Sequence, residues 1–297
     1  MPVYNGENYI KEALESLLAQ DYTNFELIIS DNASTDKTKN ICLNYMKKDK
    51  RIQYYRNDKN IGVELNINSV IKLFSGKYCM LASHDDLWFP KYISTLVKIL
   101  EGDSDIVLAF SGVQRIDHLG DSFGRPLISK NNKLNETTIE RVISVFKMRS
   151  NSKIYGLIRT DILSQTILFR SDLGVANDLC LITELSCHGK FYIDSEILFK
   201  RRKHSGQMGR LKAKNEQIWE MNENTMNWIY GLPNIQDDLD KLIRTIKKEI
   251  KKHNSIGSIK WQIAKKIRLF KRHAPQRLKN LLKKTHLHKA LYFNLFN

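Results

Sequence analysis

The chain has 297 residues, of which 42% are hydrophobic and 27% are charged, a composition that excludes wholesale disorder. Its length fits one large domain, or one domain with an appendage. The formal net charge of +16 suggests a nucleic-acid or membrane partner, but residues 241–297 hold 17 Lys and Arg against one acid, Glu249, and residues 1–240 are balanced. The excess positive charge therefore lies in residues 241–297, the tail of the chain.

The sequence contains no signal peptide and no apolar run of about 18 residues, so we expect neither export nor a membrane span. No C-x-x-C pair occurs among the four cysteines. This favours reduced, buried thiols in a cytoplasmic protein, at Cys42, Cys79, Cys180 and Cys187.

The first hundred residues alternate between helical and strand-like periodicity. Helices are expected at about 7–19, 36–48, 63–74 and 90–100, and strands at about 25–30, 51–55 and 77–82. This alternation predicts an α/β fold with a parallel sheet, whose ligands bind at the carboxyl ends of the strands. Because no strand precedes the loop-like segment 1–6, we expect either a start upstream of Met1 or a fragment that lacks a central strand.

The second half of the chain is less regular. We expect strand-like runs at about 105–115, helices at 138–148 and 177–187, and two short strands at 191–193 and 197–199. After residue 210 the pattern is helical and increasingly basic. An apolar stripe there is formed by Ile256, Ile259, Ile263, Ile267 and Phe270. We therefore divide the chain into a domain at 1–210 and a helical, basic amphipathic extension at 211–297.

Asp85 and Asp86 directly follow the strand expected at 77–82. Adjacent carboxylates in a partly desolvated site repel each other, and a hard divalent cation removes that cost. Mg²⁺ or Mn²⁺ is commonly held by one or two carboxylates together with substrate phosphates. The pair therefore indicates a metal that presents a diphosphate. The alternative is a solvated turn or a helix N-cap.

Several short motifs occur in one order along residues 1–100. They are Pro2-Val3-Tyr4-Asn5, Ser30-Asp31-Asn32-Ala33-Ser34-Thr35-Asp36, Asn60-x-Gly62-x-x-x-Asn66 and His84-Asp85-Asp86-x-Trp88-x-Pro90. In this order and spacing the chain resembles the family 2 glycosyltransferases with the GT-A fold, a Rossmann-like mixed sheet flanked by helices. A weaker resemblance continues through Tyr155-Gly156-x-x-Arg159 and Asn177-Asp178 to Arg202-x-His204.

The resemblance implies a nucleotide-diphosphate-sugar donor, Mg²⁺ or Mn²⁺, and sugar transfer with inversion. Asp31 would hydrogen-bond the nucleobase, and Asp85 would contact the ribose or the donor sugar. The remaining nucleotide-sugar contacts would come from the first loop and from the loop and helix start near residue 60: Pro2, Val3, Tyr4, Asn5, Asn60, Gly62 and Asn66.

For the reaction itself, the resemblance implies that Asp86 is the direct metal ligand, that His204 approaches the diphosphate or the metal, and that Asp178 is the catalytic base. A metal that stabilises the leaving diphosphate and one carboxylate that deprotonates the acceptor hydroxyl suffice for this transfer.

Each of these residues also has a structural alternative. Asp31 fits an Asx turn and Asp178 a helix N-terminus. His204 fits an exposed basic strand end, and Gly62 a position chosen for its backbone conformation alone.

These features together favour an inverting, metal-dependent glycosyltransferase that moves a sugar from a UDP- or dTDP-type donor to a lipid-linked or oligosaccharide acceptor in cell-surface polysaccharide biosynthesis. We expect it in the cytoplasm, bound peripherally to the inner face of the plasma membrane through its tail. A solvated face, packing on the body or on a partner, and nucleic-acid binding are the other interpretations of the tail.

Two further functions stay open. One is a nucleotidyltransferase, although the Val3-Tyr4-Asn5-Gly6-Glu7 loop lacks a Gly-rich, basic phosphate-binding pattern. The other is an inactive, truncated paralogue that serves as a membrane-associated scaffold.

Overall fold

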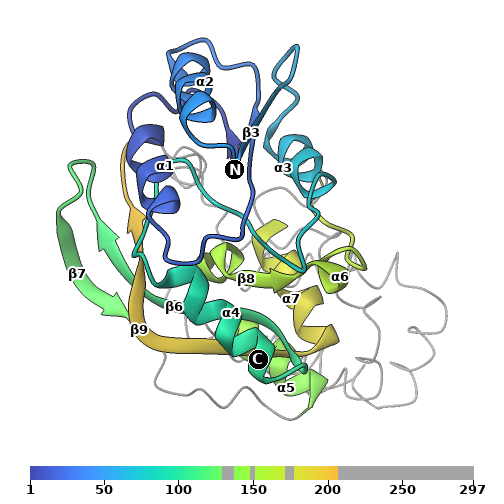
Figure 1. Cartoon of the computed structure of the whole chain (residues 1–297). Helices are drawn as coiled ribbons and strands as arrows, with labels where there is room; N and C mark the ends of the chain where they lie inside the picture. The colour runs from blue at the N-terminus through green and yellow to red at the C-terminus, as the bar shows by residue number, and fades with distance from the viewer. Residues whose placement is uncertain (129–136, 148–150, 171–176, 207–297) are drawn as a thin grey trace, which may run out of the picture. The chain divides into compact units, whose positions relative to one another are not determined.

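The computed structural model of the chain describes residues 1–128, 137–147, 151–170 and 177–206 (Figure 1). All of them belong to one compact unit, Met1–Trp219. The basic extension expected at 211–297 lies outside the described residues, and so does the polar segment 129–136. Within the described part of the chain, no helix is long and apolar enough to span a bilayer.

The amino-terminal third forms a small parallel sheet with its helices. The sheet has the order β1-β2-β3 and consists of β1 (Pro2–Val3), β2 (Leu27–Asp31) and β3 (Ile52–Arg56). The accompanying helices, in chain order, are α1 (Ile10–Leu18), α2 (Thr38–Lys48) and α3 (Val63–Ile71). These elements match the predicted alternation, and Pro2–Val3 pairs as a strand within the segment expected to be a loop.

The rest of the described chain forms a six-stranded mixed sheet. Its order is β4 (Tyr78–Met80), β8 (Leu157–Arg159), β6 (Ile106–Ile116), β9 (Lys190–Arg202) and β5 (Leu87–Trp88), with β7 (Ser122–Leu127) paired to β6. Its helices are α4 (Tyr92–Gly102), α5 (Thr138–Lys147), the 3₁₀ helix η1 (Asn151–Tyr155), α6 (Thr160–Leu163) and α7 (Asn177–His188).

The parallel sheet expected in the first hundred residues is correct for β1–β3 and wrong for β4, which pairs antiparallel with β8. The second sheet is mixed, as the GT-A resemblance implies: β6 and β9 are parallel and the other pairs are antiparallel. The two short strands expected near 191–199 are one strand, β9. Strands β5, β7 and β8 were not predicted. Two or three residues are too few to reveal a period, and β7 is exposed along its whole length, so it shows no alternation.

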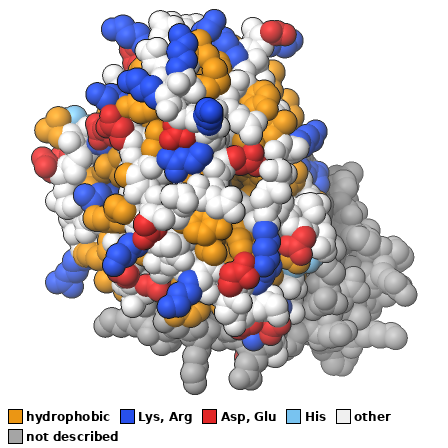
Figure 2. Space-filling view, viewed as in Figure 1, with side chains coloured by type: hydrophobic (Ala, Val, Ile, Leu, Met, Phe, Trp, Pro, Cys, Tyr) orange, Lys and Arg blue, Asp and Glu red, His pale blue; other side chains and the backbone are white. Residues whose placement is uncertain are grey.

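The second sheet carries an apolar cluster on each face. Leu157 of β8 packs with Leu96 of α4, whereas the next residue, Ile158, packs with Leu181 of α7. Successive side chains of a strand point to opposite faces, so α4 and α7 cover opposite sides of this sheet. The four cysteines are buried and free, as predicted. On the face drawn in Figure 2, acidic and basic side chains are interspersed, in keeping with the balanced charge of residues 1–240.

A groove of about 580 Å³ opens beside Met1, and its walls include Leu27 and Ile28 of β2 and Tyr78 and Met80 of β4. Strands β1 and β4 are each the last strand of their sheets. The amino group of Met1 is buried and donates a 2.6 Å hydrogen bond to the carbonyl oxygen of Ile28. Burial lowers the pKa of this amino group to about 5.

Gly156 lets η1 lie against β6, because a Cβ atom there would stand 2.6 Å from the carbonyl oxygen of Ala109 and 2.9 Å from Cβ of Phe110. We expect Gly156→Ala to lower the free energy of unfolding by about 1–3 kcal/mol, as overpacking does. Gly102→Ala is the matched control, since no atom lies within 4 Å of a Cβ at that helical position. Urea unfolding of both variants measures the difference, and equal stability of the two would contradict the packing argument.

Candidate active site

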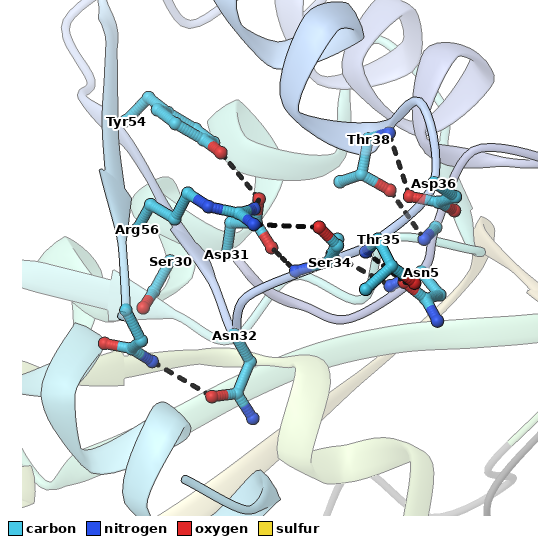
Figure 3. A network of polar contacts seen from close by, with 12 residues as sticks. Asn5, Ser30, Asp31, Asn32, Ser34, Thr35, Asp36, Thr38, Tyr54 and Arg56 are labelled. Atoms are coloured by element: carbon cyan, nitrogen blue, oxygen red, sulfur yellow. Dashed lines mark hydrogen bonds and ion pairs between the residues drawn. The ribbon is translucent and has the colours of Figure 1, made fainter. Parts of the chain in front are cut away.

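The end of β2 is held by a network around Asp31, whose side chain is fully buried (Figure 3). The Ser34 backbone N–H donates to Asp31 Oδ1 at 2.8 Å, and the hydroxyl of Tyr54 donates to Oδ2 at 2.6 Å. Arg56 forms an ion pair with the same oxygen at 2.5 Å. Burial alone would raise the pKa of Asp31, but these hydrogen bonds outweigh it and hold the pKa below its usual range.

Asn32 lies next to Asp31 and ties the chain after β3 to the end of β2. Its Oδ1 accepts hydrogen bonds from Asn57 Nδ2 and from the backbone N–H of Ile61, both at 3.0 Å. Its Nδ2 donates to Asn60 Oδ1 at 2.9 Å and to the carbonyl oxygen of Gly62 at 3.2 Å. The motif at residues 30–36 includes Asn32, but the sequence predicted no role for this residue.

Two of the residues expected near the nucleotide, Gly62 and Asn66, shape the backbone of the loop that precedes α3. Gly62 has a φ of +88°, which favours glycine, and precedes the first residue of α3. Asn66 of α3 is buried, and its side chain bonds to both Ser30 and Asn57. These contacts shape the loop at 57–62, in agreement with the structural alternative for Gly62.

The first loop, residues 1–6, lies beside the end of β2. Tyr4 is 45% exposed, whereas Val3 is buried, and Pro2 and Val3 pair with β2. Asn5 adopts a φ of +51°, and its Oδ1 accepts a 2.9 Å hydrogen bond from the backbone N–H of Thr35. A Cβ atom at Gly6 would lie 2.8 Å from His84 Cδ2, so this loop packs directly against the segment that bears the paired acids.

Asp85 and His204 form a pair, although 119 residues separate them in the sequence. His204 Nε2 lies 2.9 Å from Asp85 Oδ2, and the Ser83 hydroxyl donates to Oδ1 of the same carboxylate. The imidazole of His204 also stacks on Tyr9, with ring centroids 4.7 Å apart. A carboxylate oxygen and an imidazole nitrogen thus meet at one point beside the first loop.

Asp86 is 1% exposed and Asp85 is 6% exposed, so both acids are buried. Its Oδ1 accepts a 2.8 Å hydrogen bond from the backbone N–H of Arg202. Burial, and after it the charge of Asp85, raise the pKa of Asp86 to about 8, against the effect of the hydrogen bond from Arg202. The two carboxylates therefore differ in their partners: Asp86 accepts from the backbone of β9, and Asp85 is paired with His204.

Asp178 lies in the first turn of α7 and is half-buried. Burial raises its pKa to about 6, and the positive charge of Arg201 opposes part of this rise. A third residue connects it with the paired acids. Tyr155 is half-buried, and burial raises its pKa, with the charges of Asp86, Asp178 and Asp85 adding to the rise and that of Arg201 opposing it.

The matching families and relatives are glycosyltransferases. Residues 1–170 match glycosyl transferase family 2. An uncharacterized glycosyltransferase of Rickettsia typhi is 33% identical over 211 residues, which make up 70% of this chain and 64% of the relative. Glycosyltransferase GlyA of Streptococcus pneumoniae is 25% identical over 266 residues, covering 86% of this chain and 36% of that protein. The chain thus spans less than two-thirds of the length of each.

Two solved structures share the fold. TarS of S. aureus, in complex with UDP-GlcNAc, has a TM-score of 0.58 and 19% identity over 84% of this chain and 79% of that chain. The mannosyltransferase PcManGT of Pyrobaculum calidifontis, in complex with GDP-Man and Mn²⁺, has a TM-score of 0.51 and 15% identity over 99% of this chain and 85% of that chain. At these identities the likeness concerns the fold alone, and it confirms the predicted mixed α/β GT-A architecture.

The family match over more than half of the residues agrees with the motifs at the strand ends and with the observed sheet order. The chain belongs to glycosyl transferase family 2.

Proposed function

We propose that this chain is an inverting glycosyltransferase that moves a sugar from a nucleotide-diphosphate donor to an acceptor hydroxyl. The observation that carries the proposal is the separation of two acidic centres. Asp85 lies 2.9 Å from His204 beside the first loop, whereas Asp178 lies on a different element, α7, and has a raised pKa. Such a transfer needs one centre for the leaving diphosphate and another for the attacking hydroxyl.

The residues at the first centre fit a divalent cation that is shared with a diphosphate. Within the described residues, no three His, Cys, Asp or Glu side chains gather closely enough to hold a metal by themselves. One carboxylate and one imidazole, from Asp85 and His204, suit a Mg²⁺ or Mn²⁺ ion whose other ligands are phosphate oxygens and water. When bound, such an ion supplies Lewis-acid stabilisation of the departing diphosphate.

This geometry favours a different distribution of roles from the one expected from sequence. Asp86 was predicted to be the direct metal ligand, and Asp85 to contact the ribose or donor sugar. Because Asp86 is bonded to the Arg202 backbone whereas Asp85 is paired with His204, we propose that Asp85 and His204 face the metal and that Asp86 anchors the turn.

At the second centre, Asp178 would accept the proton of the acceptor hydroxyl. An ionised carboxylate with a pKa near 6 is a stronger base than an ordinary aspartate and is still deprotonated at neutral pH. Arg201 limits the rise in pKa, and it is held in place by a 3.1 Å hydrogen bond from its Nη1 to the hydroxyl of Ser152.

For the nucleotide, we propose that the base and ribose lie against Tyr4, Asn5 and the Asn32–Gly62 loop, with Asp31 fixing the strand end from inside. TarS is seen with UDP-GlcNAc and PcManGT with GDP-Man, which supports a nucleotide sugar as the donor class. A UDP- or dTDP-sugar is our proposed donor, and a lipid-linked or oligosaccharide glycan of the cell surface our proposed acceptor.

The tail supplies the proposed location. Residues 241–297 combine 17 basic residues with one acid and an apolar stripe, a pattern typical of helices that lie on anionic membranes. We propose that the enzyme works at the inner face of the plasma membrane, where a lipid-linked acceptor would be held.

The metal assignment is tested by two isosteric variants. We expect wild-type protein with Mn²⁺ to consume a UDP-sugar, and EDTA to stop it. Asp85→Asn should lower the rate by at least the roughly 10- to 100-fold cost seen when residues that support a metal ligand are lost. Asp86→Asn keeps an Oδ1 that accepts from Arg202, so its loss should be smaller. The reverse order of the two variants in a nucleotide-release assay would restore Asp86 as the ligand.

The base assignment is tested by Asp178→Asn. We expect turnover to fall by about 10²- to 10⁴-fold while the KM for the donor stays nearly constant. Because a protonated carboxyl cannot accept the proton, wild-type turnover should fall as the pH drops through about 6. Wild-type turnover in Asp178→Asn, or an unchanged acidic limb in its residual rate, would show that another group is the base.

Membrane attachment is tested by replacing Lys265, Lys266, Lys271 and Arg272 with Gln in the full chain. The wild-type protein should sediment with vesicles that contain phosphatidylglycerol and not with phosphatidylcholine alone. Each basic residue near an anionic surface contributes about 1 kcal/mol, so each removed charge should weaken binding about fivefold. Equal sedimentation with neutral vesicles, or no sedimentation with either, would contradict this location.

A further inference from the structure

Arg202, the last residue of β9, is fully buried and reaches three separate parts of the fold. Its Nε donates to the carbonyl oxygen of Asp85 at 2.9 Å, and its Nη1 lies 3.3 Å from the carbonyl oxygens of Asp117 and His118 in the β6–β7 turn. A buried guanidinium is costly unless its donors are bonded, so these contacts define where it can lie.

The fourth contact is an ion pair. Nη2 of Arg202 lies 2.7 Å from Glu12 Oε2 on α1, 190 residues away in the sequence. The side chain of Glu12 is 50% exposed, whereas that of Arg202 is wholly inaccessible. The pair thus links the surface of α1 to the interior of the site.

The same arginine contacts the turn that bears Asp85 and Asp86, and it also contacts the Tyr9 ring that packs against His204. Its backbone N–H holds Asp86, its Nε holds the Asp85 carbonyl, and His204 follows two residues later. Its guanidinium carbon also lies 4.7 Å from the ring centroid of Tyr9, the ring on which His204 stacks. A shift of Arg202 would therefore move the Asp85 carboxylate and the His204 imidazole relative to each other.

We infer that Arg202, held by Glu12, is a positioning residue that fixes the distance between Asp85 and His204 and thereby the affinity of the site for its divalent cation. This inference rests on the proposed role of Asp85 and His204. Glu12, which lies outside the site, thereby affects metal binding through the buried side chain of Arg202.

Glu12→Gln is the sharpest test, because Glu12 is exposed and the substitution keeps its shape. We expect Mn²⁺ binding in the presence of UDP, followed by the electron paramagnetic resonance of free Mn²⁺, to weaken roughly tenfold, the order expected when a hydrogen bond between charged groups loses one charge. The KM for the donor should rise more than kcat falls. Glu15→Gln is the matched control on the same helix, since Glu15 bonds to Tyr45 and pairs with Lys11 instead of Arg202.

A double-variant cycle asks whether Glu12 acts through Arg202. Arg202→Lys keeps the charge but cannot reach all the acceptors of the guanidinium, so it should also weaken Mn²⁺ binding. In that background Glu12→Gln should have a much smaller effect than in the wild type. Equal effects in both backgrounds would overturn the coupling.

Two other outcomes separate this inference from the proposed function. If Glu12→Gln lowers the melting temperature but binds Mn²⁺ and UDP like Glu15→Gln, Arg202 has a structural role alone and the inference fails while the proposed function stands. If the wild-type protein binds no Mn²⁺ with UDP, the proposed metal centre is wrong and the inference fails with it.

Discussion

The buried guanidinium of Arg202 is the constraint on which the rest of the site depends. A positive charge removed from water must find acceptors, and this one finds them on α1, on the turn after β4 and on the turn between β6 and β7. Segments that are distant in the sequence are thereby tied to the end of one long strand. The pairing of β9 with both β6 and β5 brings that end to the turn that bears Asp85 and Asp86.

The two parts of the proposed site differ in their electrostatics. At the end of β2, the Asp31 charge is neutralised internally by Arg56, and the neighbouring contacts are made by neutral side chains such as Asn32 and Asn57. In the other part, Asp85 and Asp86 are adjacent and Asp86 is held with a raised pKa. A neutral, hydrogen-bonding surface suits a nucleobase and ribose, whereas clustered carboxylates suit a cation bound to phosphates.

Much of the fold could be predicted from sequence, because α1, α2 and α4 are long enough for their apolar spacing to show and their boundaries were placed within about three residues. The strands β5 and β8 could not, because their pairing depends on partners far along the chain. The same limit applies to the site. Asp85 and Asp86 are identical neighbours in the sequence, and only the contacts with Arg202 and His204 distinguish them. Nothing in the spacing of Glu12 reveals its partner.

The position of Met1 has a practical consequence for labelling. Its amino group lies inside the protein, beside a groove lined by residues such as Leu27, Tyr78 and Met80. A group attached to this amino nitrogen would compete with its hydrogen bond to Ile28, so amino-terminal labelling would disturb the start of the β1–β2 pairing. Probes intended to leave the proposed site undisturbed belong on an exposed position such as Gly102 at the end of α4, where a Cβ atom would meet no atom within 4 Å.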